Sequence, residues 1–328
     1  MPRHLPRMLA ALATCGALAC GSALAQADPA SSTAAKPLHI IVGANAGGPN
    51  DIWARVVAEK LQTRFGRPAV VDNRPGAGGV IGATTLLGAP ADGNTIMVTT
   101  PSTLVLPAVL IKPKPFDLDR LAAVGLVART TLLLLAHPSV PAKNVPELLD
   151  YIRAHPRQVV TANTGVGSFG GLLMTQFADR FGVEIPQIPY KSAAPAMQAV
   201  LANETQLFTG EMTQALPLVQ SGRLRALAQF GATRSPQLPD VPTLAETPQG
   251  FVSDLWIGAV ARADTPPATL AALNRALNEV LQEPDVQQKA AASGATAAAG
   301  PPQVLADIMA RDVASFVPLI QKYNLKAD

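Results

Sequence analysis

The sequence predicts an α/β protein of two lobes, each a sheet covered by helices, with a ligand cleft between the lobes. Short apolar segments of strand type alternate with helical segments along the chain, which is the pattern of helix-covered sheets. About 300 residues follow a predicted leader, more than a single hydrophobic core usually holds. Two predicted strands carry the chain between the lobes, so we expect a hinged clamshell.

Residues 1–25 have the composition of a cleavable signal peptide. Arg3 and Arg7 give a short basic region, residues 8–19 are apolar, and Ala23 and Ala25 supply the small residues that a signal peptidase recognises. The apolar stretch is shorter than the ~20 residues that a membrane-spanning helix needs, which disfavours a retained anchor. We therefore predict cleavage after Ala25, export of the remaining chain, and a flexible segment over residues 26–36.

The positions of the cysteines and the balance of charge disfavour thiol-dependent sites and nucleic-acid binding. Cys15 and Cys20 are the only cysteines and both lie in the predicted leader, so the exported chain has no thiol for a disulfide, a metal or a nucleophile. Lipidation at Cys20 remains an alternative, although Ala17 stands where a lipidation motif usually has leucine. The leader holds two basic residues and no acidic one, which leaves 24 basic and 23 acidic side chains. This near balance argues against a nucleic-acid partner, which would select a clustered basic face.

The first lobe is predicted over residues 37–137 and 259–328, and the second over residues 138–258. First-lobe strands are expected at residues 39–42, 69–71, 95–99, 124–128 and 132–137, and a strand at residues 255–261 returns the chain to this lobe. A helix over residues 50–65 carries Trp53, Val57 and Leu61 on one apolar face, which predicts that Trp53 lies in the core. Helices over residues 267–281, 284–293 and 302–321 close the chain.

The second lobe has the same alternation. Its strands are expected at residues 159–163, 186–188, 206–209 and 226–230. Its helices are expected at residues 146–154, 195–201 and 213–221, with another that ends at residue 181.

Glycine-rich turns follow several of these strands and precede helices, at residues 43–51, 74–82 and 164–168. Adjacent glycines let the backbone approach a ligand closely. The first-turn N–H groups of the following helix have no partner within the helix, so they can hold an anion. The turns therefore predict a carboxylate site.

Motifs spread over nearly the whole chain point to a family. Segment 36–100 includes Pro-Ala-Asp-Gly-Asn-Thr at 90–95, and it is followed in order by His-Pro-Ser-Val-Pro-Ala-Lys at 137–143, Pro-Tyr-Lys at 189–191, Gly-Arg-Leu-Arg-Ala-Leu-Ala at 222–228 and Leu-Pro-Asp-Val-Pro-Thr at 238–243. In these motifs the chain resembles the periplasmic solute receptors of tripartite tricarboxylate transporters, also called Bug-type receptors. The resemblance implies a periplasmic-binding-protein clamshell (type II-like) that passes a small organic carboxylate to integral-membrane permease subunits. We expect a monomer.

The resemblance also implies that the ligand lies between the lobes, held by the first-lobe loops and by the turn at residues 164–168. The candidate ligand-binding residues of the first lobe are Ala44, Asn45, Gly47, Gly48, Asn50, Asp51, Gly78, Gly79 and Ser102. Those of the second lobe are Thr164, Gly165, Gly167, Ser168, Tyr190, Lys191 and Glu211. Asn50 and Ser168 also suit helix N-caps, and the two roles are compatible. Arg74 is expected to serve the structure of its turn.

Two departures from the family leave the ligand open. The family commonly has Phe-Pro-Pro-Gly-Gly where residues 44–48 are Ala-Asn-Ala-Gly-Gly, and an acid near Gly210, where an ammonium group could be held. The loss of that acid disfavours an amino-acid ligand, but Glu211 could replace it. A ligand sensor that presents its closed form to a signalling partner uses the same clamshell and is the alternative to a transport receptor.

Enzymatic functions are disfavoured. Residues 165–170 fit the dinucleotide motif G-x-G-x-x-G, but Glu184, at the spacing expected of the ribose-binding acid, precedes the next strand instead of ending it. A serine-hydrolase elbow at Ser168 requires glycine where Val166 stands. The histidines form no cluster with metal-ligand spacing. We therefore expect no catalytic residue, no metal and no cofactor.

Overall fold

The structure, a computed structural model, describes residues 36–165 and 167–326. The predictions of a leader over residues 1–25 and of cleavage after Ala25 fall outside these residues, as do the alternative of lipidation at Cys20 and nearly all of the segment 26–36. Among the helices of this part of the chain, none combines the length and apolar character required to span a bilayer.

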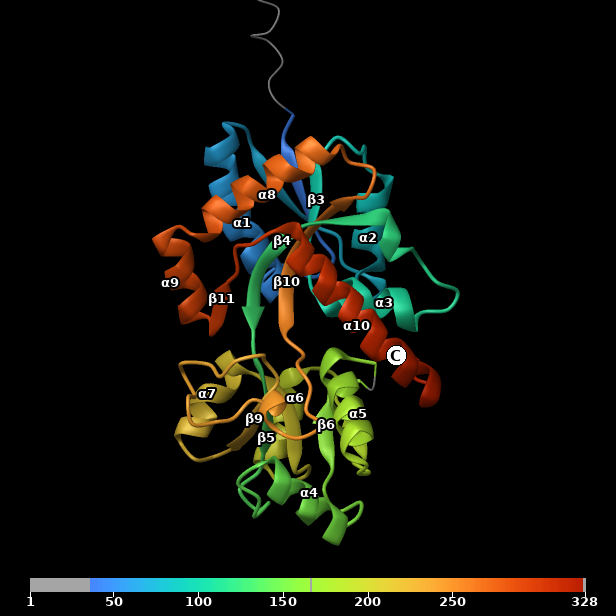
Figure 1. Cartoon of the computed structure of the whole chain (residues 1–328), viewed down its shortest axis with the longest axis vertical. Helices are drawn as coiled ribbons and strands as arrows, with labels where there is room; N and C mark the ends of the chain where they lie inside the picture. The colour runs from blue at the N-terminus through green and yellow to red at the C-terminus, as the bar shows by residue number, and fades with distance from the viewer. Residues whose placement is uncertain (1–35, 166, 327–328) are drawn as a thin grey trace, which may run out of the picture. The chain divides into compact units, whose positions relative to one another are not determined.

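A six-stranded sheet forms the upper half of the molecule in Figure 1, in the order β11-β4-β10-β3-β1-β2. The strands are β1 (Leu38–Val42), β2 (Ala69–Asn73), β3 (Thr95–Thr99), β4 (Leu121–Thr130), β10 (Leu255–Arg262) and β11 (Ala295–Ala297). β1 pairs in parallel with β2 and β3, whereas β10 is antiparallel to both β3 and β4. Two chain segments distant in sequence therefore build this first sheet.

Helices cover both faces of the first sheet. One face packs against α1 (Pro49–Phe65), α8 (Pro267–Leu281) and α9 (Pro284–Ala292), where Trp53 is buried in the core as predicted. The other face packs against α2 (Val80–Gly88), α3 (Val105–Leu110) and the first part of α10 (Pro302–Lys322). Short 3-10 turns at Ala77–Gly79 (η2), Pro101–Thr103 (η3) and Leu118–Arg120 (η4) connect these elements.

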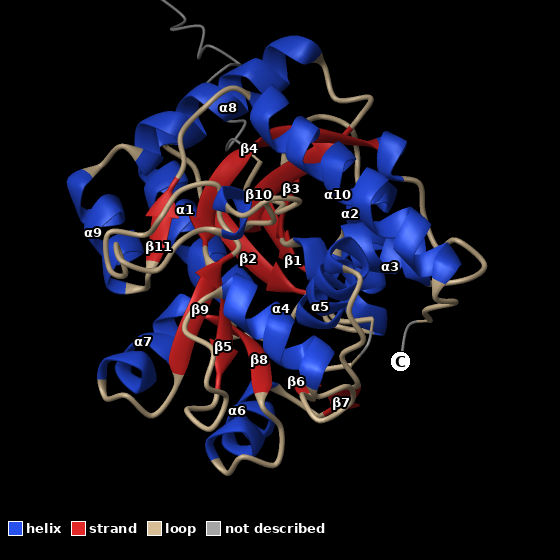
Figure 2. Cartoon of the chain, turned by 60° about the horizontal axis from the view of Figure 1, so that its bottom comes forward, coloured by secondary structure: helices blue, strands red, loops and turns tan. Residues whose placement is uncertain are grey.

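A five-stranded sheet forms the lower half, in the order β7-β6-β8-β5-β9. Its strands are β5 (Leu132–Ala136), β6 (Thr161–Asn163), β7 (Gln187–Pro189), β8 (Leu207–Glu211) and β9 (Arg225–Gln229). Its helices are α4 (Val145–Ala154), α5 (Phe169–Phe181), α6 (Ala193–Leu201) and α7 (Met212–Gln220), and a 3-10 turn, η5, lies at Leu244–Glu246. α4 and α5 pack on one face and α6 and α7 on the other, as Figure 2 shows from below. The predicted α/β class with two helix-covered sheets is confirmed.

Sheet membership differs from the prediction at the crossing between the sheets. The strand predicted at residues 132–137 was assigned to the first lobe, but β5 pairs with β8 and β9 in the second sheet. The chain therefore leaves the first sheet after Thr130 and returns with β10 at Leu255. The segment 132–136 is apolar throughout, so periodicity does not reveal which sheet it joins.

The C-terminal helix contributes to both halves, which the prediction of a wholly first-lobe C-terminus did not foresee. Leu305 and Ile308 of α10 pack against the first sheet. Phe316 and Ile320 pack in the second core, where the Phe316 ring meets the Phe169 ring edge-on with centroids 5.9 Å apart. The strand β11 was also not predicted.

Candidate functional site

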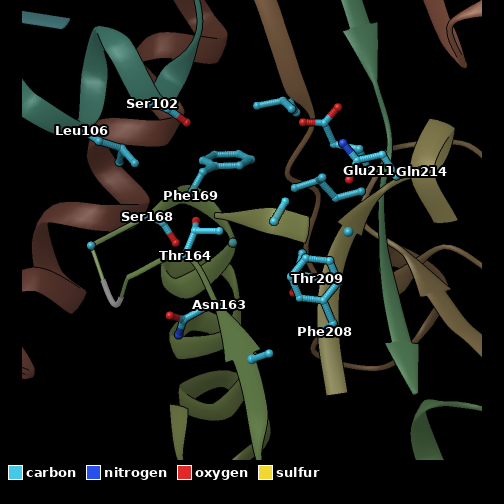
Figure 3. A pocket seen from close by; sticks show the side chains of 17 residues that line it. Ser102, Leu106, Asn163, Thr164, Ser168, Phe169, Phe208, Thr209, Glu211 and Gln214 are labelled. Carbon is cyan, nitrogen blue, oxygen red and sulfur yellow. The ribbon is translucent and has the colours of Figure 1, made fainter. Parts of the chain in front are cut away.

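A cavity of about 280 Å³ opens where the strand ends of the second sheet face η3 and α3. Its polar lining consists of Ser102, Asn163, Thr164, Ser168, Thr209, Glu211 and Gln214. Apolar side chains complete the walls, namely Leu106, Leu132, Phe169, Phe208 and Leu255. In Figure 3, Thr164 and Ser168 lie on one side of the cavity, and Glu211 and Gln214 lie on the other.

The turn between β6 and α5 forms the first of these sides. Asn163 closes the turn, since its side-chain oxygen accepts a hydrogen bond from the Gly165 N–H at 2.9 Å. Gly165 has a φ of 115°, a conformation that glycine adopts readily. Ser168 is the N-cap of α5, and its hydroxyl oxygen accepts a bond from the Gly171 N–H at 3.1 Å. The hydroxyl hydrogen remains available as a donor, so the predicted capping role leaves room for a ligand contact.

Glu211 forms the opposite side. It ends β8 and precedes α7, without a side-chain capping bond. Within the described residues its carboxyl is the only ionisable group that lines the cavity. Burial raises the pKa of Glu211, because desolvation disfavours the charged form. Thr209, also in the cavity wall, has a buried hydroxyl oxygen without a hydrogen-bond partner in this part of the chain.

Several polar groups of the first-lobe loop at residues 43–51 bond within the protein. The buried Asp51 carboxylate accepts bonds from the Gly47 N–H at 2.9 Å, from Arg55 Nε at 2.9 Å and from Asn73 Nδ2 at 3.0 Å. The bond from Arg55 is the largest of the effects that hold the pKa of Asp51 at about 2. These bonds tie the loop to α1 and β2, so Asp51 acts as a structural anchor of the loop.

Asn50 also bonds within the protein. The N-cap of α1 is Gly48, with Pro49 at the first helical position, so the prediction of Asn50 as an N-cap is wrong. The Asn50 amide instead donates to Thr103 Oγ1 at 3.1 Å, across to η3.

The nearby glycines allow the first-lobe loops to pack closely. A Cβ on Gly79 would lie 2.3 Å from the Thr103 carbonyl oxygen, and one on Gly82 would lie 2.7 Å from the Gly43 Cα. Contacts this short exclude any side chain at these positions. Close backbone approach is thus required here by the neighbouring loops, whatever the ligand.

The structure brings part of the predicted set together. Ser102, Thr164, Gly167, Ser168 and Glu211 line the cavity. Gly78 lines an adjoining pocket of about 420 Å³ that shares Ser102, Thr164, Gly167 and Ser168 with it.

The other candidates do not line either space. These are Ala44, Asn45, Gly47, Gly48, Asn50, Asp51, Gly79, Gly165, Tyr190 and Lys191, whose ligand contacts stay predictions. Tyr190 packs against the core between the second sheet and α6, and Lys191 is exposed beyond the edge strand β7.

Several lining residues were not predicted. Asn163 and Thr209 lie at or near the carboxyl ends of β6 and β8, and Gln214 lies one helical turn after Glu211. Because the carboxyl ends of parallel strands meet at one edge of a sheet, the pairing of β6 with β8 places these residues together. The position of Asn163 and Thr209 at or near the ends of predicted strands was the sequence feature that could have identified them as lining residues. Within the described residues there is also no group of three or more His, Cys, Asp or Glu placed to hold a metal ion.

Comparison with known proteins gives consistent results. Residues 53–325 match the model of the tripartite tricarboxylate transporter family receptor. Protein BugT of Bordetella pertussis (strain Tohama I) is 33% identical over 319 residues, which cover 96% of this chain and 98% of BugT. The solved periplasmic binding protein BugD matches with a TM-score of 0.69 and 29% identity over 89% of this chain and 99% of BugD. R. palustris Rpa4515 with adipate matches with a TM-score of 0.70 and 28% identity over 87% of this chain and 96% of that one.

Proposed function

The chain belongs to the tripartite tricarboxylate transporter receptor family of periplasmic solute-binding receptors, and we propose that it captures a small organic carboxylate for delivery to integral-membrane permease subunits. The cavity between the Ser168 turn and Glu211 is the proposed binding site. The observation that carries the proposal is the N-terminus of α5, which opens onto this cavity with the Ser168 hydroxyl beside it.

A helix N-terminus attracts anions for two reasons. Its first N–H groups have no acceptor within the helix, and the aligned peptide dipoles place partial positive charge there. The lining of hydroxyl and amide groups adds neutral hydrogen-bond donors around that end. A carboxylate is therefore the group best suited to the α5 end of the cavity. Adipate, the molecule bound to Rpa4515, is a dicarboxylate of this chemical class.

Cavity size limits the ligand. A volume of about 280 Å³ lies below the ~300–1,000 Å³ typical of pockets for drug-sized ligands. A small organic acid is consistent with this volume.

Contacts from both halves provide a mechanism for ligand-dependent closure. Ser102 and Leu106 approach the cavity from the first half of the molecule, and Ser168 and Glu211 approach it from the second. A ligand favours closure only if it binds the closed form more tightly than the open form. A carboxylate that contacts both sides in the closed form meets this requirement.

Thermal unfolding with a ligand panel tests the proposal. Adipate, succinate and malate represent small dicarboxylates, and NAD and glucose represent nucleotides and sugars, which we do not expect to bind. A ligand at 100 times its dissociation constant stabilises the protein by about 2.7 kcal/mol, which is visible as a raised melting temperature. Stabilisation by NAD or glucose, together with none by any carboxylate, would overturn the proposal.

We also propose that the protein reaches the periplasm after cleavage behind Ala25, on the basis of the leader composition. The intact mass of protein recovered from the periplasm should match a chain that begins at Gln26. A diacylglyceryl adduct on Cys20 would contradict this and indicate a lipoprotein.

A further inference from the structure

Glu211 occupies an unusual position in the proposed site. No lysine, arginine or histidine lines the cavity in the described part of the chain, and Glu211 is the one acid that does. Its carboxyl has no hydrogen-bond partner among the described residues and faces the cavity opposite Thr164 and Ser168 (Figure 3). A site proposed for carboxylates therefore contains a carboxyl group and no cation.

The elements around Glu211 do not supply a compensating charge. β5, α3, α6 and α7 contain no charged residue. The charged residues of α5, Asp179 and Arg180, lie in its last turn, and the one in β10, Arg262, lies at the far end of that strand. Near the crossing between the sheets, Arg129 and Asp254 bond each other at 3.2 Å and neither lines the cavity. Lys191, before α6, is exposed.

Two ionised carboxylates repel each other in such a cavity, because no lysine, arginine or histidine among the described residues lines it to offset their charge. A single shared proton removes the repulsion. It converts the pair into an O–H···O⁻ hydrogen bond, which is among the shorter and stronger hydrogen bonds. Burial favours the neutral form of an acid, so the partly buried Glu211 takes this proton more readily than an exposed carboxyl does.

We propose that Glu211 is protonated in the ligand-bound receptor and donates its O–H to a ligand carboxylate, so that binding takes up one proton from solvent. The inference rests on the proposed function. At pH values where the empty receptor is ionised, the solvent proton forms the O–H bond on the Glu211 carboxyl and no ligand bond breaks. Affinity should therefore fall as pH rises.

Calorimetric titration tests the proposal, with whichever of adipate, succinate and malate binds most tightly. Titrations at pH 6 and pH 8, each in phosphate and in Tris, give the number of protons exchanged, because the two buffers have different ionisation enthalpies. We expect uptake of about one proton at pH 8. The dissociation constant should rise by up to about tenfold per pH unit above the pKa of Glu211 in the empty receptor.

Glu211→Gln tests the role of the proton, because it keeps the shape of the side chain and removes its ability to titrate. The amide introduced by this change is neutral at every pH and keeps an N–H donor, so we expect binding without proton uptake and without the pH dependence. Glu204→Gln is the matched control, because Glu204 is exposed just before the same strand, β8. This variant should behave as the unchanged protein does.

The outcomes distinguish the two proposals. Carboxylate binding without proton uptake by the unchanged protein would overturn the inference alone. Loss of binding in Glu211→Gln at both pH values, in a variant with an unchanged circular dichroism spectrum, would also overturn it, because a neutral N–H donor at residue 211 would then not replace the protonated carboxyl. If none of the three dicarboxylates binds, the proposed function fails and the inference fails with it.

Discussion

The junction between β1 and α1 and the junction between β6 and α5 share one pattern, a strand, a glycine-containing turn and a helix. Of the two, the β6–α5 junction lines the cavity, through Thr164, Gly167 and Ser168. At the β1–α1 junction the Gly47 N–H bonds to Asp51, and Asn50 bonds to Thr103. The polar groups of the β1–α1 junction therefore bond to other protein groups, whereas the β6–α5 junction faces a cavity.

The side chains near each turn account for this difference. Asp51 lies in the first turn of α1, and its carboxylate accepts a bond from the Gly47 N–H of the loop and places a negative charge at this helix end. The first turn of α5 contains no acid, and its cap is the short, neutral Ser168. A glycine-rich turn before a helix therefore indicates an anion site only when no nearby acid already occupies the helix end.

The largest expected effect concerns the close packing of the first-lobe loops. Gly79→Ala places a Cβ 2.3 Å from the Thr103 carbonyl oxygen at a φ of 107°. We expect a loss of about 2–6 kcal/mol in the free energy of unfolding, from backbone strain and overpacking together. Urea unfolding measures it.

Gly78→Ala is the matched control for this change. Gly78 also has a positive φ, 65°, but a Cβ there meets no atom within 4 Å. Gly78→Ala should therefore reduce the free energy of unfolding by about 1–2 kcal/mol, the penalty of the left-handed conformation alone. Equal losses at both positions would mean that close packing is not the reason for glycine at residue 79.

The next effect tests the anchoring role of Asp51. Asp51→Ala removes the acceptor of three hydrogen bonds at a buried position, which should cost about 2–3 kcal/mol of unfolding free energy. Asp72→Ala is the control, because Asp72 pairs with Arg74 at the surface and should contribute at most about 1 kcal/mol. Urea unfolding and adipate titration are compared for each. Unchanged stability with lost affinity in Asp51→Ala would show that this loop binds the ligand directly.

Much of the fold was predictable from the sequence, since β3 and α8 have the predicted bounds. Their amphipathic or apolar patterns are local properties of the chain. The sheet joined by β5 was not predictable, because its apolar residues suit either sheet. The site was predicted in part for the same reason. Thr164 and Ser168 follow a glycine pattern, whereas Thr209 reaches the cavity wall through strand pairing, which the sequence does not display.

A smaller effect on folding, with a distinct effect on binding, is expected at Ser168. Ser168→Ala should weaken carboxylate binding by about 1.5–3 kcal/mol, because in the proposed site its hydroxyl donates a hydrogen bond to the charged ligand. The lost helix cap should reduce stability by about 1 kcal/mol. Gly167→Val should weaken binding further, since its side chain blocks approach to the turn. Calorimetric titration with adipate, beside melting curves of the empty variants, measures both quantities.

Asn144→Ala is the control for the stability lost when a helix N-cap is removed. Asn144 caps α4 through a bond from the Glu147 N–H at 2.9 Å, and neither residue lines the cavity. It should lose about 1 kcal/mol of stability and keep its affinity. Equal affinities of the Ser168→Ala, Gly167→Val and unchanged proteins would indicate that the β6–α5 turn, like the β1–α1 loop, serves only the fold.

The smallest expected effect is a difference in how folding stability depends on pH in the β1–α1 loop and in the cavity. The pKa values of Asp51 and Glu211 are shifted in opposite directions. The pKa of Asp51 is lowered to about 2, so its stabilisation is present above its unfolded value of 3.8 and is lost as pH falls toward 2. The pKa of Glu211 is raised by burial. A native state that holds the proton more tightly than the unfolded chain loses stability as pH rises through the folded pKa.

The empty Glu211→Gln variant should therefore gain stability relative to the unchanged protein between pH 4 and pH 8, measured by urea unfolding at both pH values. A stability difference that does not change with pH would mean that Glu211 titrates alike in the folded and unfolded chains, and the two regions would then not differ in how they treat an acid.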